Sequence, residues 1–161
     1  MVLWFAVLAP VAVAEVFRSP LVDYRLVVVG ALLPLVEVVA GRSLLLHTLA
    51  APVVVLTVVM LTTMGHRLVR RRLLGVPIGL FLHLVLDATW ADSTSFWWPA
   101  FGLSPAEVAV PEIGRPLALL VVLDLVAVGV AVWAWRRYHL ADRANRELLV
   151  RTGHLARGVL A

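Results

Sequence analysis

Five apolar runs, separated by short charged or turn-forming stretches, most constrain how this chain can fold. They cover residues 2–17, 26–40, 48–64, 73–91 and 116–135. A bilayer core takes about 20 helical residues, so we interpret each run as one crossing. The chain is 62% apolar and 15% charged, whereas soluble domains average about 45–50% and about 25%. The pattern predicts an all-α fold, a polytopic integral membrane bundle of about five transmembrane helices.

Two of the runs are short for a membrane crossing. The run 2–17 has no basic stretch before it and no small-residue cleavage site after it, so we expect a retained helix and not a signal peptide. The run 26–40 contains Pro34 and Glu37. Proline interrupts helices, so we expect a tilted or broken helix there, whose outer end lines a cavity.

The arginines predict an orientation. Twelve of them lie in 18–25, 66–72 and 136–161, which leaves only Arg42 and Arg115 on the other side. Cytoplasmic loops carry the excess of basic residues, so the N-terminus is expected outside and the C-terminus in the cytoplasm. Residues 1–135 then form the transmembrane helical domain, and 136–161 form a basic cytoplasmic tail, interpreted as an interfacial helix on the lipid bilayer.

The net charge of +4 raises the question of nucleic acid. The arginines stand at the ends of apolar runs, however, where a membrane already accounts for them. No nucleic-acid binding is expected.

The segment His83-Leu84-Val85-Leu86-Asp87 places an imidazole and a carboxylate four residues apart in an apolar run. Such residues share one helix face, so they could hold one ion or share one proton. In the predicted topology Glu37 and His47 lie at the same depth. Because the chain has no cysteine, any metal must be held by histidine and carboxylate, ligands that suit zinc or another divalent ion.

We therefore predict a divalent metal ion, with zinc as the first candidate, on Glu37, His47, His83 and Asp87. Glu37 and Asp87 are also the candidate catalytic residues, since a carboxylate that does not bind the metal can act as a base. Asp124 is expected to orient one of the imidazoles from behind.

A structural interpretation of the same residues stays open. A histidine–aspartate pair inside a helical bundle can neutralise itself and fix helix packing without any ligand. Trp97, Trp98 and Phe101 in the loop 92–115 can likewise be an interfacial anchor or a lid over a site.

Four short segments in order, 33–37, 46–49, 83–87 and 97–102, resemble the membrane-bound metal-dependent hydrolases of the bacterial inner membrane. This family is also described as LexA-binding, inner membrane-associated hydrolases, the YdjM-like group. Its pattern is a Pro-Asp-Xaa-Asp turn, a His-Arg-Gly-Xaa-Thr-His-Ser segment, a His-Xaa-Xaa-Xaa-Asp helix and a Trp-Pro-Phe close. The resemblance covers roughly residues 23–102 and implies a multi-pass protein of the bacterial cytoplasmic (inner) membrane.

Carried over by position, Glu37 stands for the second aspartate of the turn, and His47 for the second histidine of its segment. His83 and Asp87 stand for the pair on the helix. The chain departs from the family pattern at two places: Leu35 replaces the first aspartate, and an arginine at 42 stands near the first histidine. Two potential ligands of the family are thus missing here.

Three functions fit these observations. The first is a membrane-embedded metal-dependent hydrolase acting at the outer leaflet on a lipid or lipid-linked ester. The second is a non-catalytic small membrane protein that binds or scaffolds another membrane protein, which Leu35 and Arg42 favour. The third is a proton or ion pathway through Glu37, Asp87 and Asp124, for which the chain offers few polar residues.

Overall fold

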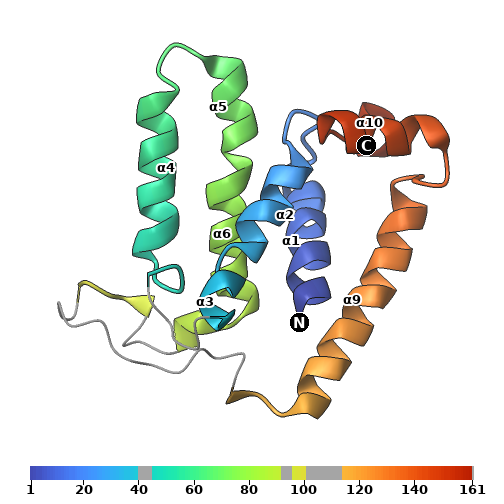
Figure 1. Ribbon diagram of the computed structural model, residues 1–161. Helices are drawn as coiled ribbons and strands as arrows, with labels where there is room; N and C mark the ends of the chain where they lie inside the picture. Colours follow the sequence, from blue (N-terminus) through green and yellow to red (C-terminus); the bar gives the residue numbers. More distant parts are fainter. Residues whose placement is uncertain (40–44, 92–95, 101–113, 161) are drawn as a thin grey trace.

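The computed structural model describes residues 1–39, 45–91, 96–100 and 114–160, and every regular element in these ranges is a helix (Figure 1). The helices are α1 (Val2–Phe17), α2 (Tyr24–Leu32), α3 (Leu35–Val39), α4 (Ala50–Thr62), α5 (Arg67–Leu73), α6 (Gly75–Leu86), α9 (Leu117–Arg137) and α10 (Arg143–Thr152). Short 3₁₀ turns cover Thr89–Ala91 and Arg157–Val159.

Helices α1, α2 and α6 form the centre of the molecule. The most extensive contact joins α2 to α6, while α1 packs on α2, α6 and α9, and α4 packs on the other side of α6 (Figure 1). The core residues with no exposed surface are Phe5, Ala9, Val13, Val27, Ala31, Leu80, Leu84 and Ala127.

Two glycines allow α2 and α6 to cross with their backbones in contact. A Cβ on Gly30 would overlap the carbonyl oxygen of Val76, and a Cβ on Gly79 would overlap that of Val27. Any larger residue at either position would force the helices apart. This crossing fixes where the end of α6 lies relative to α2.

Several apolar runs are divided between shorter helices. Pro34 separates α2 from α3, since proline cannot continue the hydrogen bonding of a helix and restricts the residue before it. Helix α6 ends at Asp87, after which Ala88 adopts a positive φ of 56°. Residues 26–39 therefore form a broken helix, and residues 75–91 form a helix of 12 residues followed by a turn.

The prediction of about five transmembrane helices is wrong. Within the described part of the chain only α9 is long and apolar enough to cross a bilayer, with 21 residues, or about 32 Å at 1.5 Å per residue. Helices α1 and α4 are apolar but have 16 and 13 residues. A run of apolar residues need not be one helix, and the folded chain spends part of the runs 26–40 and 73–91 on bends. The orientation with the N-terminus outside rested on five alternating crossings, so it loses its basis.

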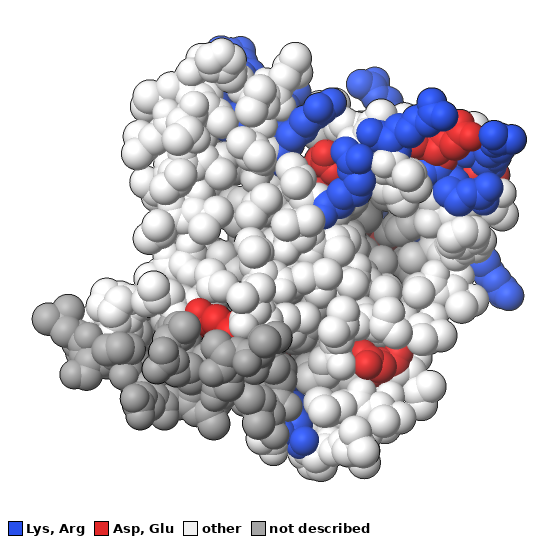
Figure 2. Space-filling model, in the orientation of Figure 1, with Lys and Arg blue, Asp and Glu red and all other residues white. Residues whose placement is uncertain are grey.

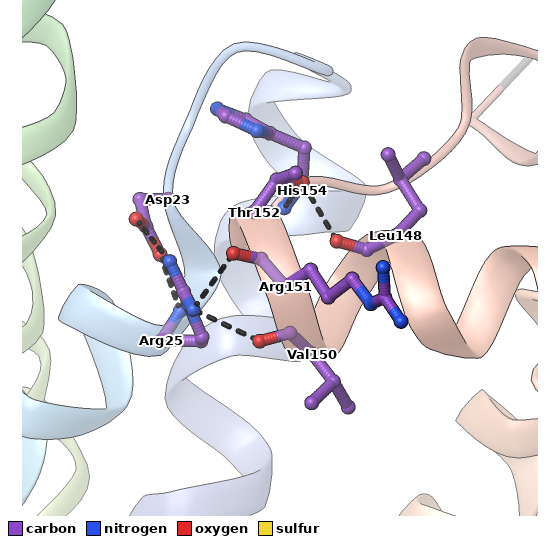
Figure 3. Close-up of polar contacts among 7 residues, drawn as sticks. All are labelled: Asp23, Arg25, Leu148, Val150, Arg151, Thr152 and His154. Carbon is purple, nitrogen blue, oxygen red and sulfur yellow. Dashed lines mark hydrogen bonds and ion pairs between the residues drawn. The ribbon is translucent and has the colours of Figure 1, made fainter.

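Residues 136–160 pack against the bundle. Helix α10 lies across the end of the molecule where α1 and α9 finish (Figure 1). Tyr24 N donates to Gly153 O over 2.8 Å, and Arg25 Nη1 donates to the carbonyls of Val150 and Arg151 (Figure 3). Leu155, Val159 and Leu160 belong to the same hydrophobic core as α1 and α2.

Candidate metal centre

His83 lies in the last turn of α6 and is completely buried. Its Nδ1 is 2.7 Å from the carbonyl oxygen of Ala31 on α2. A carbonyl oxygen only accepts, so Nδ1 carries the proton, and in the neutral ring the lone pair is on Nε2. The ring of Phe5 stacks on the imidazole at a centroid distance of 3.9 Å. The imidazole is therefore held in one orientation by three helices.

His47 precedes α4 and is also completely buried. Its Nδ1 is 2.7 Å from Oε2 of Glu37 on α3. The other oxygen of Glu37 accepts hydrogen bonds from the backbone N–H groups of Leu45 and Leu46, both at 2.8 Å. One carboxylate thus fixes both the imidazole and the chain that carries it. With Nδ1 donating to this carboxylate, the lone pair of the neutral His47 ring is on Nε2.

Asp87 caps the end of α6 and is 1% exposed. Its Oδ1 accepts from Arg115 Nη1 at 2.6 Å, and its Oδ2 accepts from the Thr89 hydroxyl at 3.0 Å. Arg115 also donates to the backbone carbonyl of Asp87. A guanidinium from the start of α9 therefore offsets the charge of a buried carboxylate at the end of α6.

These residues meet at one point. His47, His83 and Asp87 each offer a ligand atom, and the three atoms lie within 4.8 Å of one another. The two imidazole rings are nearly perpendicular, at 80°, with centroids 5.4 Å apart. The group could hold a metal ion.

The hydrogen bonds made by Nδ1 of the two imidazoles follow a pattern that is common in metal centres. Metal-binding histidines almost always donate their second ring nitrogen to a carboxylate or a backbone carbonyl, which fixes the tautomer and the ring orientation. His47 uses the carboxylate of Glu37 and His83 uses the carbonyl of Ala31. Two imidazoles and one carboxylate are also a ligand set of catalytic zinc sites, which keep a fourth position for water.

The structure brings together three of the four predicted ligands. Glu37 lies one hydrogen bond further out, behind His47. Asp124 does not orient an imidazole, so that prediction is wrong: its carboxylate accepts from the Met1 amino group and from Trp4 N, at 3.0 and 3.3 Å.

Arg115 belongs to this site through its ion pair with Asp87, although it was not among the residues predicted from the sequence. Arg115 stands directly before the apolar run of α9, apart from the arginine clusters. That isolation was the available signal, because an arginine away from the other basic groups needs a partner of its own. The arginine at 42 and the phenylalanine at 101 lie outside the described residues. Trp97 is 44% exposed.

Comparisons with known proteins return nothing for this chain: no protein-family model, no curated protein and no solved structure matches it.

Proposed function

We propose that this chain is a membrane-associated, metal-dependent hydrolase whose divalent ion is bound by His47, His83 and Asp87. The observation that carries the proposal is the convergence of three ligand atoms within 4.8 Å. Both imidazoles in this group are oriented through Nδ1. Zinc is the first candidate, since nitrogen and oxygen ligands in this combination suit it.

Each residue of the site has a distinct role in the proposal. His47 and His83 present Nε2 to the ion, and Asp87 supplies one carboxylate oxygen. Glu37 orients His47 and raises its basicity. A divalent ion in such a site lowers the pKa of a bound water towards about 7, which supplies a nucleophile for ester hydrolysis at neutral pH.

Helix α9 supports a membrane location. Only 11% of the apolar stretch of this helix is buried inside the molecule. Its residues Leu117, Val122 and Leu125 are 75%, 54% and 65% exposed. A core helix of a soluble protein would instead bury most of this surface. With the resemblance to inner-membrane metal-dependent hydrolases, this favours the bacterial inner membrane as the location. An ester of a lipid-type molecule is then the natural substrate class.

The proposal is tested by the metal content of the purified protein, measured by plasma mass spectrometry after zinc or manganese is offered and excess is removed. We expect near-stoichiometric metal in the wild type and its loss in His83→Ala and Asp87→Ala. His66→Ala is the matched control, because His66 is exposed and outside the site. Glu37→Gln should weaken metal binding by about 10–100-fold without abolishing it.

Activity is then measured on model phosphodiesters and carboxylic esters, with and without a chelator. Hydrolysis that needs the metal and is lost in Asp87→Ala supports the proposal. A metal-loaded protein that hydrolyses neither class of ester would contradict the hydrolase part of the proposal.

A structural role is the second candidate, and the Arg115–Asp87 ion pair favours it. This pair, with Phe5 stacked on His83, holds α1, α6 and the start of α9 together without any ion. In that case the wild type stays free of metal, while His83→Ala and Asp87→Ala are only less stable. The function would then lie in binding another membrane protein.

A further inference from the structure

An open groove of about 420 Å³ lies between α1, α4 and α6. All of its lining residues are apolar, among them Val13, Phe17, Val53, Leu56 and Phe81. Phe17, Val53 and Leu56 are 60%, 53% and 41% exposed. Its volume is in the range of about 300–1,000 Å³ that is typical of ligand sites. We refer to it as the α1–α4–α6 groove.

A polar hollow adjoins this groove at Ile78. The hollow, of about 310 Å³, is lined by Ser19 and Arg71 as well as by apolar residues. Ile78 lines both the hollow and the groove. A third hollow next to it contains Arg18 and Arg157 and shares Leu21 with the second. The apolar groove therefore adjoins a hollow that contains the guanidinium group of Arg71, and Arg18 and Arg157 line the hollow beyond it.

The arginine-lined hollow beside the groove lies at the same end of the molecule as the arginines that end α9. Helix α9 finishes with Arg136 and Arg137, at the same end of the molecule as α5 and the finish of α1 (Figure 1). On the face shown in Figure 2, most basic side chains gather over α10 and the neighbouring helix ends. If α9 crosses a bilayer, these arginines are at the depth of the lipid headgroups.

We propose that the α1–α4–α6 groove binds one acyl chain of an anionic phospholipid, with the headgroup phosphate at Arg71 and Ser19. An apolar groove that ends in arginines is complementary to a ligand with an apolar chain and a negative head. Arginine suits the phosphate because its planar guanidinium donates two parallel hydrogen bonds.

This lipid is a bound component and not the proposed substrate. Arg71 precedes α6, whereas His83 lies in its last turn, so the headgroup and the candidate metal centre are at opposite ends of one helix. The inference therefore stands or falls independently of the metal site.

Native mass spectrometry of the detergent-solubilised protein tests the headgroup. Phosphatidylglycerol and phosphatidylcholine with identical acyl chains are offered separately. We expect one phosphatidylglycerol to be retained and phosphatidylcholine to bind more weakly. Arg71→Gln should weaken phosphatidylglycerol binding by about fivefold. Arg70→Gln, on the same helix but outside the hollow, should leave it unchanged. Equal binding of the two lipids, or equal effects of the two variants, would overturn the proposal.

The acyl chain is tested with two tryptophan variants of α4. Val53 lines the groove and is 53% exposed, while the adjacent Val54 is 58% exposed and does not line it. Val53→Trp should lose the retained lipid, and Val54→Trp should keep it, with equal helicity by circular dichroism. The native mass spectra also report the oligomeric state. A lipid-free wild-type dimer that Val53→Trp converts to a monomer would show that a second copy of the chain covers the groove, and the proposal would be wrong.

Discussion

The imidazole of His83 donates a hydrogen bond from Nδ1 to the carbonyl oxygen of Ala31 over 2.7 Å. The two residues are 52 positions apart, and their contact depends on the backbone contact between α2 and α6 at Gly30 and Gly79. The orientation of a candidate metal ligand is therefore coupled to the packing of two glycines.

Gly79→Ala is expected to destabilise the protein and to weaken metal binding. The added Cβ would overlap the backbone carbonyl of Val27, which cannot move aside as a flexible side chain can. Overpacking of this kind costs about 1–3 kcal/mol. Thermal unfolding in detergent and metal content measure the two effects.

Gly129→Ala on α9 is the matched control. A Cβ there meets no other atom within 4 Å, and alanine favours the helix over glycine by about 0.5–1 kcal/mol. The control should be unchanged or slightly more stable, with normal metal content. A Gly79→Ala protein that behaves like this control would show that α2 and α6 do not cross as described.

Arg115→Gln is expected to lower the free energy of unfolding by about 3–5 kcal/mol, because it leaves the buried carboxylate of Asp87 without its charged partner. If Asp87 is a metal ligand, added zinc offsets the same charge, so the loss should shrink when zinc is present. Unfolding of wild type and variant is measured with zinc and with a chelator. A loss that is equal under both conditions would mean that no ion reaches Asp87.

Gly153→Ala is expected to release residues 153–160 from the start of α2. Gly153 has a positive φ of 77°, and a Cβ there would overlap Oδ1 of Asp23. A non-glycine residue in such a conformation costs about 1–3 kcal/mol. Limited proteolysis after Arg157 and thermal unfolding report the change. Gly158→Ala is the control, since its Cβ meets nothing within 4 Å. Equal protection of the two variants from cleavage would contradict the described docking.

The docking of residues 136–160 should also depend on acid. Burial by itself raises the pKa of Asp23, but hydrogen bonds from Arg25, its charge, and backbone N–H groups outweigh this and hold the pKa below its usual 3.8. A folded-state pKa that is depressed contributes stability that is fully present above the unfolded value and is lost as the pH falls through the folded value. The contribution should therefore be complete above about pH 4 and be lost progressively as the pH falls through the lowered pKa of Asp23.

Unfolding of wild type and Asp23→Asn at a series of pH values measures this contribution. The wild type should be more stable at neutral pH, and the difference should vanish in acid. Arg25→Gln should reduce the same difference, because Arg25 Nε and Nη2 both donate to the Asp23 carboxylate. A difference that does not diminish at any pH as the solution is acidified below the usual pKa of 3.8 would show that the charge of Asp23 does not contribute.

The helical class, the position of the first helix and the candidate metal group of His47, His83 and Asp87 could all be predicted from the sequence. Histidines and carboxylates are rare in the apolar runs, so each one is easily recognised as a candidate site residue. Pro34 predicts a break because proline has no N–H for the hydrogen bonding of a helix. Segment length was the error. A hydropathy pattern counts apolar residues, but it does not show how many of them continue one helix, as the separation of α5 from α6 at Leu74 illustrates.

The sequence by itself determined that the chain is helical, because its long apolar runs favour helices. It also determined that histidine and carboxylate are the available metal ligands, because the chain has no cysteine. Only the tertiary structure decided which of these groups meet. It placed Glu37 behind His47, paired Asp87 with Arg115, and moved Asp124 to the start of α1. These contacts join residues far apart in the chain, and they follow from how closely the helices can approach, which no local pattern of residues encodes.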